Sequence, residues 1–188
     1  MTKHNNPLLL ASSSPRRKAL LEAAGFQLAV YSPNVDETWP GGAPESGVIQ
    51  IAQKKLAACP TDSSVCLAAD TIVCIDGKIL GKPQDEKDAL QMLKMLSGRC
   101  HEVFTAFALR YQNQHIHGVV RSLVWFRLLQ DDEMNRYIST GEPFDKAGSY
   151  GIQGQGAFLL DRIEGSYTNI MGLPLKEVLH SIEQLHKQ

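Results

Sequence analysis

The stretch LLLASSSPRR, residues 8–17, begins with an unbroken apolar run, passes through three serines and ends in Pro15, Arg16 and Arg17. So short an apolar run is typical of a buried strand, and serines in sequence interrupt a strand. Proline is favoured at the first position of a helix, and glycine is favoured just after its end. The stretch therefore predicts a buried strand at residues 7–11, followed by a helix that starts at Pro15 and stops before Gly25.

The rest of the chain adds more strand–helix units and two hairpins. We expect strands at residues 27–31, 65–75, 78–80, 103–111, 116–128 and 158–163, and helices at 45–59, 85–96, 131–140 and from residue 174. Asp76-Gly77 is a strong signal for a tight hairpin turn. This mixture predicts an α/β (α+β) fold with a central mixed, partly antiparallel twisted sheet flanked by helices.

Composition excludes several classes of protein. The chain has 188 residues, and its 19 Lys and Arg against 20 Asp and Glu give a net charge of -1, which argues against a surface that coats nucleic acid. With 43% hydrophobic and 21% charged residues the chain has ordinary globular usage. Its four cysteines form no C-x-x-C pair, which favours reduced thiols. Without a signal peptide or membrane-spanning run, we expect a soluble cytoplasmic protein that binds neither membrane nor nucleic acid.

The serine turn of residues 12–14 is a candidate anion site. A strand that ends at the start of a helix directs backbone N–H groups and hydroxyls towards one point. Arg16 and Arg17 in the first helical turn oppose the helix dipole, and a bound phosphate would remove that conflict. The alternative is an ordinary serine cap beside two solvated arginines, and the local sequence leaves both open.

Two acidic positions are candidate catalytic or metal-binding residues. Asp70 interrupts an apolar strand, where an unpaired carboxylate is costly, so it is a candidate base or metal ligand. The alternative is an aspartate bonded to nearby backbone. The adjacent acids Asp36 and Glu37 lie in a long loop, residues 32–47. They would complete a hard-cation site with Asp70 unless that loop is simply solvated.

Scattered lysines and a glycine-rich stretch complete the candidates. Lys55, Lys82 and Lys146 are unremarkable singly, but phosphoryl chemistry needs several convergent cations. Residues 151–156 lack the spacing and context of a dinucleotide-binding loop, so a mobile turn is one interpretation and contact of Gln153 with a base or phosphate is another. A metal site at His115 and His117 is a weaker hypothesis than a surface pair.

Taken together, the separated motifs of this chain resemble the Maf family of nucleoside triphosphate pyrophosphatases. The match extends from about residue 8 to 182 and is specific because its motifs occur in the family's order. They are Leu10–Arg17, Val35–Glu37, Ala52–Lys55, Ala69–Val73, Gly81–Pro83, Leu96–Gly98 with His101, Val103 and Thr105, Glu142-Pro143 with Asp145–Gly154, and Gly172–Leu175.

The resemblance implies hydrolysis of a nucleoside triphosphate to its monophosphate and pyrophosphate with a divalent cation, Mg²⁺ or Mn²⁺. It implies a single domain, residues 1–188, of two lobes with a deep cleft, similar to inosine triphosphatases. A homodimer and roles in cleaning nucleotide pools and inhibiting septum formation are also associated with the family. Arg16, Thr71 and Gln153 resemble the dTTP/UTP type at its specificity positions, and Asp70 matches the proton acceptor.

The resulting hypothesis is a metal-assisted attack of water on the α-phosphorus. Glu37 and Asp70 would hold the metal, and Asp70 would activate the water. The phosphates would be held by Ser12, Ser14, Arg16, Arg17, Lys55 and Lys82. Gln50, where many relatives carry arginine, and Ala68, in place of the usual glycine, depart from the family pattern. The alternatives are a nucleotide-binding septum regulator without turnover and a pyrophosphatase for 7-methyl-GTP.

Overall fold

The apolar run at the start of the chain forms a fully buried strand, β1 (Leu8–Ala11), in a computed structural model that describes residues 7–60 and 64–185. The other strands are β2 (Leu28–Tyr31), β3 (Cys66–Ile75), β4 (Lys78–Leu80), β5 (Cys100–Tyr111), β6 (Gln114–Phe126) and β7 (Leu160–Glu164). The helices are α1 (Pro15–Ala23), α2 (Pro44–Ala57), α3 (Glu86–Leu96), α4 (Asp131–Ile138), α5 (Tyr167–Ile170) and α6 (Leu175–Leu185). Three short 3-10 turns, η1 (Glu142–Asp145), η2 (Ala147–Ser149) and η3 (Gly154–Leu159), lie between α4 and β7.

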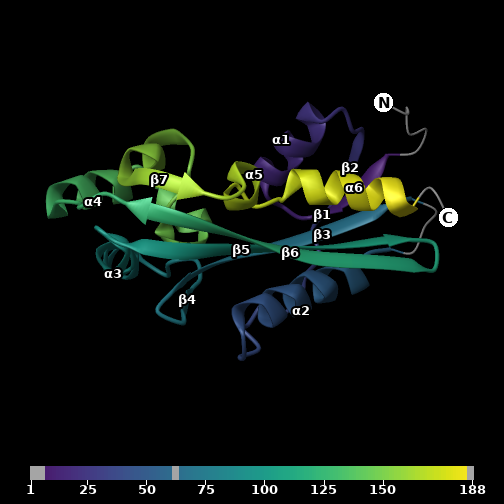
Figure 1. Ribbon diagram of the computed structural model, residues 1–188, viewed down its shortest axis with the longest axis horizontal. Helices are drawn as coiled ribbons and strands as arrows, with labels where there is room; N and C mark the ends of the chain where they lie inside the picture. The colour runs from purple at the N-terminus through teal and green to yellow at the C-terminus, as the bar shows by residue number, and fades with distance from the viewer. Residues whose placement is uncertain (1–6, 61–63, 186–188) are drawn as a thin grey trace. The chain divides into compact units, whose positions relative to one another are not determined.

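The strands form one mixed sheet with helices along it, which confirms the predicted fold class (Figure 1). Its order is β2-β1-β3-β5-β6-β7, with β4 paired to β3. The pairs β1–β2 and β1–β3 are parallel, and β3–β4 and β6–β7 are antiparallel. Every predicted element forms within three residues of its expected bounds, whereas α5 and the three 3-10 turns were not predicted.

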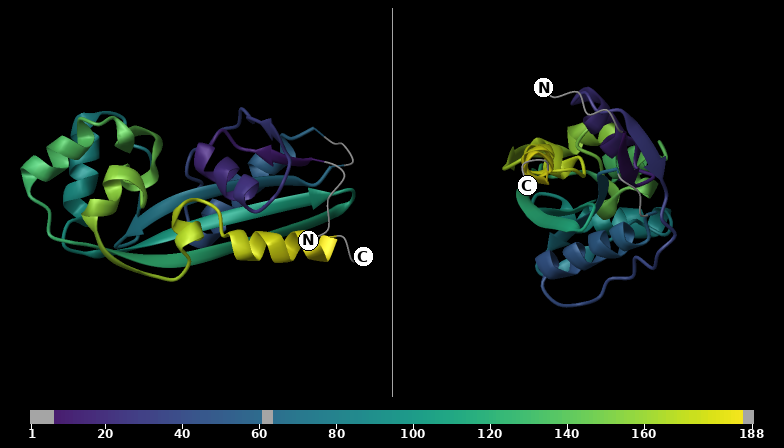
Figure 2. Two further views of the ribbon diagram at one scale, coloured as in Figure 1. Left: turned by 90° about the horizontal axis from the view of Figure 1, so that it is seen from above. Right: turned by 90° about the vertical axis from the view of Figure 1, so that its right-hand side faces the viewer.

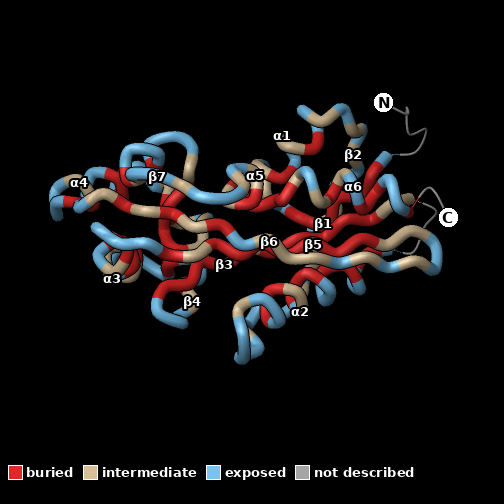
Figure 3. The backbone as a smooth tube through the Cα atoms, in the orientation of Figure 1, coloured by how far each residue is buried: buried red, intermediate tan, exposed pale blue. Residues whose placement is uncertain are grey.

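The chain divides into two compact units, and three strands, β3, β5 and β6, contribute residues to both. The first unit comprises residues 1–70, 105–120 and 172–188, and the second comprises residues 71–104 and 121–171. In the first unit, one apolar core joins Leu10 of β1, Leu67 of β3 and Leu109 of β5 to α1 and α6. Figure 3 shows β1, β3 and β5 mostly buried, whereas exposed residues occur on the helices, along β6 and in the loops.

The first three strands form a topological switch point. Ala11 pairs in parallel with Tyr31 of β2 on one side and with Ala68 of β3 on the other. Helix α1 connects β1 to β2, and α2 connects β2 to β3. The two helices lie on opposite faces of these strands in Figure 1, and the right-hand view of Figure 2 agrees. In α/β sheets, ligands bind beyond the carboxyl ends of the strands at such a point. The serine turn that follows β1 occupies this position.

The β3–β4 hairpin turns at the predicted dipeptide. Asp76 and Gly77 have φ of 51° and 76°, the left-handed region that a two-residue turn of this kind requires at both positions. Ile75 and Lys78 pair directly across it. The turn fixes the register of β4, so that Leu80 is buried in the core of the second unit.

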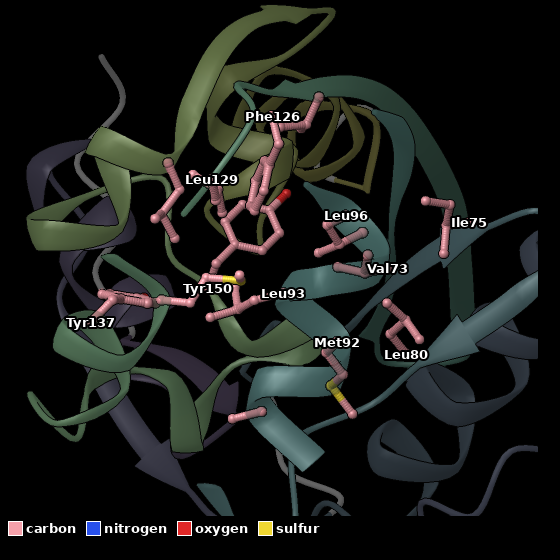
Figure 4. Packing of buried hydrophobic residues seen from close by; sticks show 14 of the residues in the cluster. Val73, Ile75, Leu80, Met92, Leu93, Leu96, Phe126, Leu129, Tyr137 and Tyr150 are labelled. Atoms are coloured by element: carbon pink, nitrogen blue, oxygen red, sulfur yellow. The ribbon is translucent and has the colours of Figure 1, made fainter. Parts of the chain in front are cut away.

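The core of the second unit is mostly aliphatic and includes a group of packed aromatic side chains (Figure 4). The rings of Phe126 and Tyr150 meet edge to face with centroids 4.7 Å apart, and the ring of His101 packs against both. His101 is 2% exposed, its Nε2 bonds the Tyr150 hydroxyl at 2.7 Å, and its Nδ1 has no partner within the described residues. Burial lowers the pKa of His101 from 6.5 to about 3, so the imidazole stays neutral in the folded protein.

Acid is therefore expected to destabilise the protein through His101. Below pH 6.5 the unfolded chain takes up a proton at this histidine, whereas the folded protein does not until about pH 3. The stability contributed by the neutral imidazole is complete above pH 6.5 and is lost as the pH falls, with a slope of about 1.4 kcal/mol per pH unit. Urea unfolding between pH 7 and pH 4 measures this slope. The variant His101→Gln should lose it, and an equal slope in variant and wild type would contradict the assignment.

None of the four cysteines forms a disulfide, as the sequence predicts. Cys59, Cys66 and Cys74 are buried and Cys100 is exposed. No helix within residues 7–60 and 64–185 is both long and apolar enough to cross a membrane.

Candidate active site

A buried lysine joins the two predicted acidic residues. Lys55 Nζ lies 2.6 Å from Oδ1 of Asp70 and 2.8 Å from Oε2 of Glu37. The side chains of Lys55 and Asp70 are only 8% and 13% exposed, whereas that of Glu37 is 47% exposed. Asp70 is thus bonded to a side chain of another element, and the alternative of an aspartate satisfied by nearby backbone is wrong. The arrangement places two carboxylates around one cation at the switch-point strand β3.

Local periodicity explains why these side chains meet. Residues two apart on a strand share a face, so Asp70 lies on the same face of β3 as Ala68. Lys55 lies one helical turn after Ile51 on the buried side of α2. An apolar helix face with one lysine therefore packs on an apolar strand with one aspartate, and each charge gives the other the partner that burial demands.

Glu37 is brought to this pair by an irregular loop that is attached to α2. The Asp36 carboxylate accepts a hydrogen bond from the Thr38 N–H at 2.9 Å, and hydrogen bonding by the Thr38 side chain, together with this backbone bond, lowers the pKa of Asp36. The Trp39 indole lies over Gly47 of α2, where a Cβ would come within 2.2 Å of the ring. These contacts hold the loop on either side of Glu37, so the interpretation of the loop as merely solvated is wrong for this residue.

The two carboxylates are suitable ligands for a hard cation whose remaining ligands come from the substrate. Both bond the same ammonium nitrogen, so a positive charge already lies between them. Mg²⁺ is commonly held by one or two carboxylates together with phosphate oxygens. No group of three or more histidine, cysteine, aspartate or glutamate side chains that could hold a metal occurs in the described residues. A complete protein-made cage is therefore not found there, and His115 and His117 are both exposed on β6.

The serine turn is bound by a buried arginine. Arg17 is 8% exposed; its Nε donates to the Gly172 carbonyl at 2.7 Å, and its Nη1 donates to Ser12 Oγ at 3.0 Å. Burial lowers the pKa of Arg17, although the charges of Asp70 and Glu37 act in the opposite direction. The alternative of two solvated arginines is therefore wrong for Arg17.

The start of α1 differs from an ordinary serine cap. Ser14 is the N-cap residue, but its side chain makes no capping hydrogen bond, and the first turn contains no acidic residue. Its backbone N–H instead donates to Ser12 Oγ at 3.2 Å. Arg16 is half-buried in the first turn. The predicted residues Ser12, Ser14 and Arg16 thus lie together where β1 passes into α1.

Four further predicted residues belong to the second unit. Thr71 follows Asp70 directly in β3 and is half-buried, and Lys82 and Gln153 are exposed on loops. Lys146 Nζ donates to the Glu142 carbonyl and pairs with the Asp145 carboxylate at 2.6 Å. Contact of these four residues with substrate stays a prediction.

Two residues that position the Gln153 loop were missed by sequence reasoning. The Glu142 carboxylate accepts hydrogen bonds from the backbone N–H groups of Gln155 and Gly156 at 3.1 and 3.3 Å. The Tyr137 hydroxyl accepts from Gly151 N–H at 3.2 Å, and burial and the Glu142 charge raise the pKa of Tyr137. Glu142 lies in one of the motifs that resemble the family, and this could have indicated a role in the site. Nothing in the sequence near Tyr137 indicates that Tyr137 holds this loop.

Close backbone packing in the glycine-rich loop predicts a large effect of a small substitution. A Cβ on Gly156 would lie 2.2 Å from the Gly151 carbonyl oxygen, so Gly156→Ala must displace backbone and is expected to lower the free energy of unfolding by about 2 kcal/mol. Urea unfolding measures this loss. Gly81→Ala is the matched control, because a Cβ there meets nothing within 4 Å, and it should stay within about 0.5 kcal/mol of wild type. Equal stabilities for the two variants would contradict the packing argument.

Comparison with known proteins gives a consistent result over nearly the whole chain. The profile of a family described as Maf-like protein matches residues 7–185. A dTTP/UTP pyrophosphatase of Desulfotalea psychrophila is 47% identical over 187 residues, which cover 97% of this chain and 96% of the relative. One of Citrifermentans bemidjiense is 46% identical over 183 residues, 95% of both chains. One of Halalkalibacterium halodurans is 47% identical over 180 residues, 94% of this chain and 95% of the relative.

Proposed function

The chain belongs to the Maf family, and from this membership we propose that it hydrolyses dTTP and UTP to the nucleoside monophosphate and pyrophosphate. The observation that carries the proposal is the pairing of Asp70 and Glu37 around Lys55 at the topological switch point. A buried aspartate, a cation beside it and a helix start with hydroxyl groups are the parts that phosphoryl transfer by water requires.

Asp70 acts on the water that attacks the α-phosphorus. Lys55 bonds Oδ1 of its carboxylate, which leaves Oδ2 to accept a hydrogen bond from water and to take its proton. The lysine also holds the carboxylate in one orientation, and a fixed base contributes by positioning as well as by basicity.

Glu37 and Asp70 are the residues that would hold a divalent cation, Mg²⁺ or Mn²⁺. When bound, the cation neutralises charge on phosphate oxygens and polarises the phosphorus. A ligating carboxylate is a weaker base than a free one. We therefore assign different roles to the two oxygens of Asp70: Oδ1 bonds Lys55, and Oδ2 accepts the hydrogen bond from water.

The phosphates are held by the serine turn and by cations. Ser12 and Ser14 supply hydroxyl groups, and Arg16 and Lys82 supply positive charge that offsets the charge on the leaving pyrophosphate. Thr71 and Gln153, with Arg16, select the base, because the resemblance to the dTTP/UTP type lies in these residues. Gln50 is exposed on α2, so the loss of an arginine charge there leaves the Lys55 pair intact.

Several broader expectations from the resemblance form part of the proposal. They are a single domain of two lobes with a deep cleft, a homodimer and a cytoplasmic location. Housecleaning of nucleotide pools, with inhibition of septum formation, is the cellular role that the family association suggests.

A panel of triphosphates with Mg²⁺ tests the proposed substrate. The kcat/KM for dTTP and UTP should exceed that for 7-methyl-GTP by at least about tenfold, since pocket contacts to a base edge are worth 1–3 kcal/mol. Faster cleavage of 7-methyl-GTP would overturn the substrate assignment. Tight binding of dTTP without turnover in Mg²⁺, Mn²⁺ or Co²⁺ would favour the non-catalytic regulator.

A further inference from the structure

Both hydrogen-bond acceptor positions of Ser12 are filled from inside the protein. Its Oγ accepts from Arg17 Nη1 at 3.0 Å and from the backbone N–H of Ser14 at 3.2 Å. A serine hydroxyl has two acceptor lone pairs and one donor hydrogen. The only capacity that remains is the hydrogen, and within residues 7–60 and 64–185 the structure shows no bond that this hydroxyl donates.

The Arg17 guanidinium, which donates one of these hydrogen bonds to Ser12, is buried and held in place. Arg17 is 8% exposed and Ser12 is 7% exposed. Another bond of the guanidinium, from Nε to the Gly172 carbonyl at 2.7 Å, joins α1 to the segment that precedes α6. Because a guanidinium is planar, fixing Nε also fixes the direction of Nη1. Arg17 is therefore aimed at Ser12 by a contact on its far side.

A hydroxyl that accepts a hydrogen bond from a cation becomes a stronger donor. The Ser12 hydrogen is thus a polarised donor at the carboxyl end of β1, beside the first turn of α1. A phosphate oxygen is the acceptor that suits this donor, since a carboxylate or phosphate at a helix start is favoured by the helix dipole.

We propose that Arg17 is a positioning residue: it acts on the substrate's phosphates through Ser12, by holding the serine hydroxyl as a donor to a phosphate oxygen. This inference rests on the proposed function for the identity of the substrate. It replaces direct contact between the Arg17 guanidinium and phosphate, which the sequence alone suggested. It also explains why a cation in the first turn of a helix is buried instead of extended into solvent.

The coupling between the two residues tests the proposal. Pyrophosphate binding by calorimetry should weaken about tenfold in Arg17→Met and about tenfold in Ser12→Ala, as expected for loss of one hydrogen bond to a charged group. The double variant should bind no more than about twofold more weakly than either single variant, because both changes remove the same donor. A direct phosphate contact would instead multiply the two effects to about a hundredfold, and that result would overturn the proposal, as would unchanged binding in Ser12→Ala.

The kinetic signature separates positioning from a general loss of structure. KM for dTTP should rise with the loss of pyrophosphate affinity while kcat changes by less than about threefold, because the bond is made in the bound substrate and in the transition state alike. Lys18→Met is the matched control. It removes an exposed cation from the next position of α1, where Lys18 pairs with Glu22 at 3.7 Å, and KM should not change. A fall in kcat at unchanged KM in Arg17→Met would overturn the proposal.

Two measurements keep the outcome interpretable. If Arg17→Met does not fold, Ser12→Ala alone decides through its pyrophosphate affinity, and Arg17→Lys, which keeps the charge but not the two-pronged geometry, should bind pyrophosphate more weakly than wild type. Calorimetry with pyrophosphate requires no turnover. If the proposed hydrolysis is wrong, the reaction products of dTTP will differ from dTMP and pyrophosphate. If this inference is wrong, the effects of Arg17→Met and Ser12→Ala on pyrophosphate binding will multiply in the double variant.

Discussion

Replacement of Asp70 by asparagine is expected to lower kcat for dTTP about a thousandfold, which lies within the usual range for loss of a general base. Asparagine cannot take a proton from water, and it is a poorer ligand for a hard cation. The variant should still fold. Its side-chain oxygen can accept the hydrogen bond from Lys55, and Lys55 keeps its pairing with Glu37. Steady-state kinetics at saturating dTTP and Mg²⁺ measure the loss.

The control for this variant is the same substitution at an exposed carboxylate. Asp76 pairs with Arg99 at 2.6 Å at the tip of the β3–β4 hairpin, and its side chain is 71% exposed. Asp76→Asn should keep wild-type kcat, since asparagine also tolerates the positive φ of this turn. A kcat for Asp70→Asn within tenfold of wild type would remove Asp70 from the chemistry.

Replacement of Lys55 by methionine is expected to reduce both stability and activity. The change leaves the buried Asp70 carboxylate beside Glu37 with no ammonium between them, and loss of one partner of a buried ion pair costs about 3 kcal/mol. We expect kcat to fall about a hundredfold, because the base loses its fixed orientation and the site loses a positive charge. Urea unfolding measures the loss in the free energy of unfolding, and EDTA is added so that no divalent ion replaces the lysine.

Two further variants isolate the buried pair. Lys54→Met removes the exposed neighbouring charge from the same helix and should leave the free energy of unfolding within about 0.5 kcal/mol of wild type. The double variant Lys55→Met/Asp70→Asn should be more stable than Lys55→Met, because the unpaired buried charge is gone. Equal stabilities of Lys55→Met and wild type would contradict the buried pairing.

The elements of the fold were predictable because their signals are local. The apolar run before Ser12, the proline that starts α1 and the Asp76-Gly77 turn each act over a few residues, and each formed within three residues of its expected bounds. Helix α5 spans only Tyr167–Ile170, too short for any periodicity to show. The 3-10 turns around Gly148 and Gly154 depend on tertiary contacts that no local pattern contains.

The site was predictable as a set of residues but not as a geometry. Asp70 was identifiable because a carboxylate in an apolar strand needs a partner, yet nothing local indicated that the partner would be Lys55, 15 residues earlier. For Arg17, the sequence suggested the wrong kind of contact. Its charge suggested contact with substrate, whereas its bond to the Gly172 carbonyl, 155 residues later, directs it inward. Long-range pairing of buried polar groups is set by the packing of the whole first unit.

The central claim is attack of water on the α-phosphorus, and the fate of solvent oxygen tests it most directly. The protein is incubated with dTTP and Mg²⁺ in water enriched in oxygen-18, and the products are resolved by phosphorus NMR and mass spectrometry. The account predicts dTMP that carries one oxygen-18 atom, together with unlabelled pyrophosphate. Formation of dTDP with labelled orthophosphate, or label in the pyrophosphate instead of in dTMP, would contradict it.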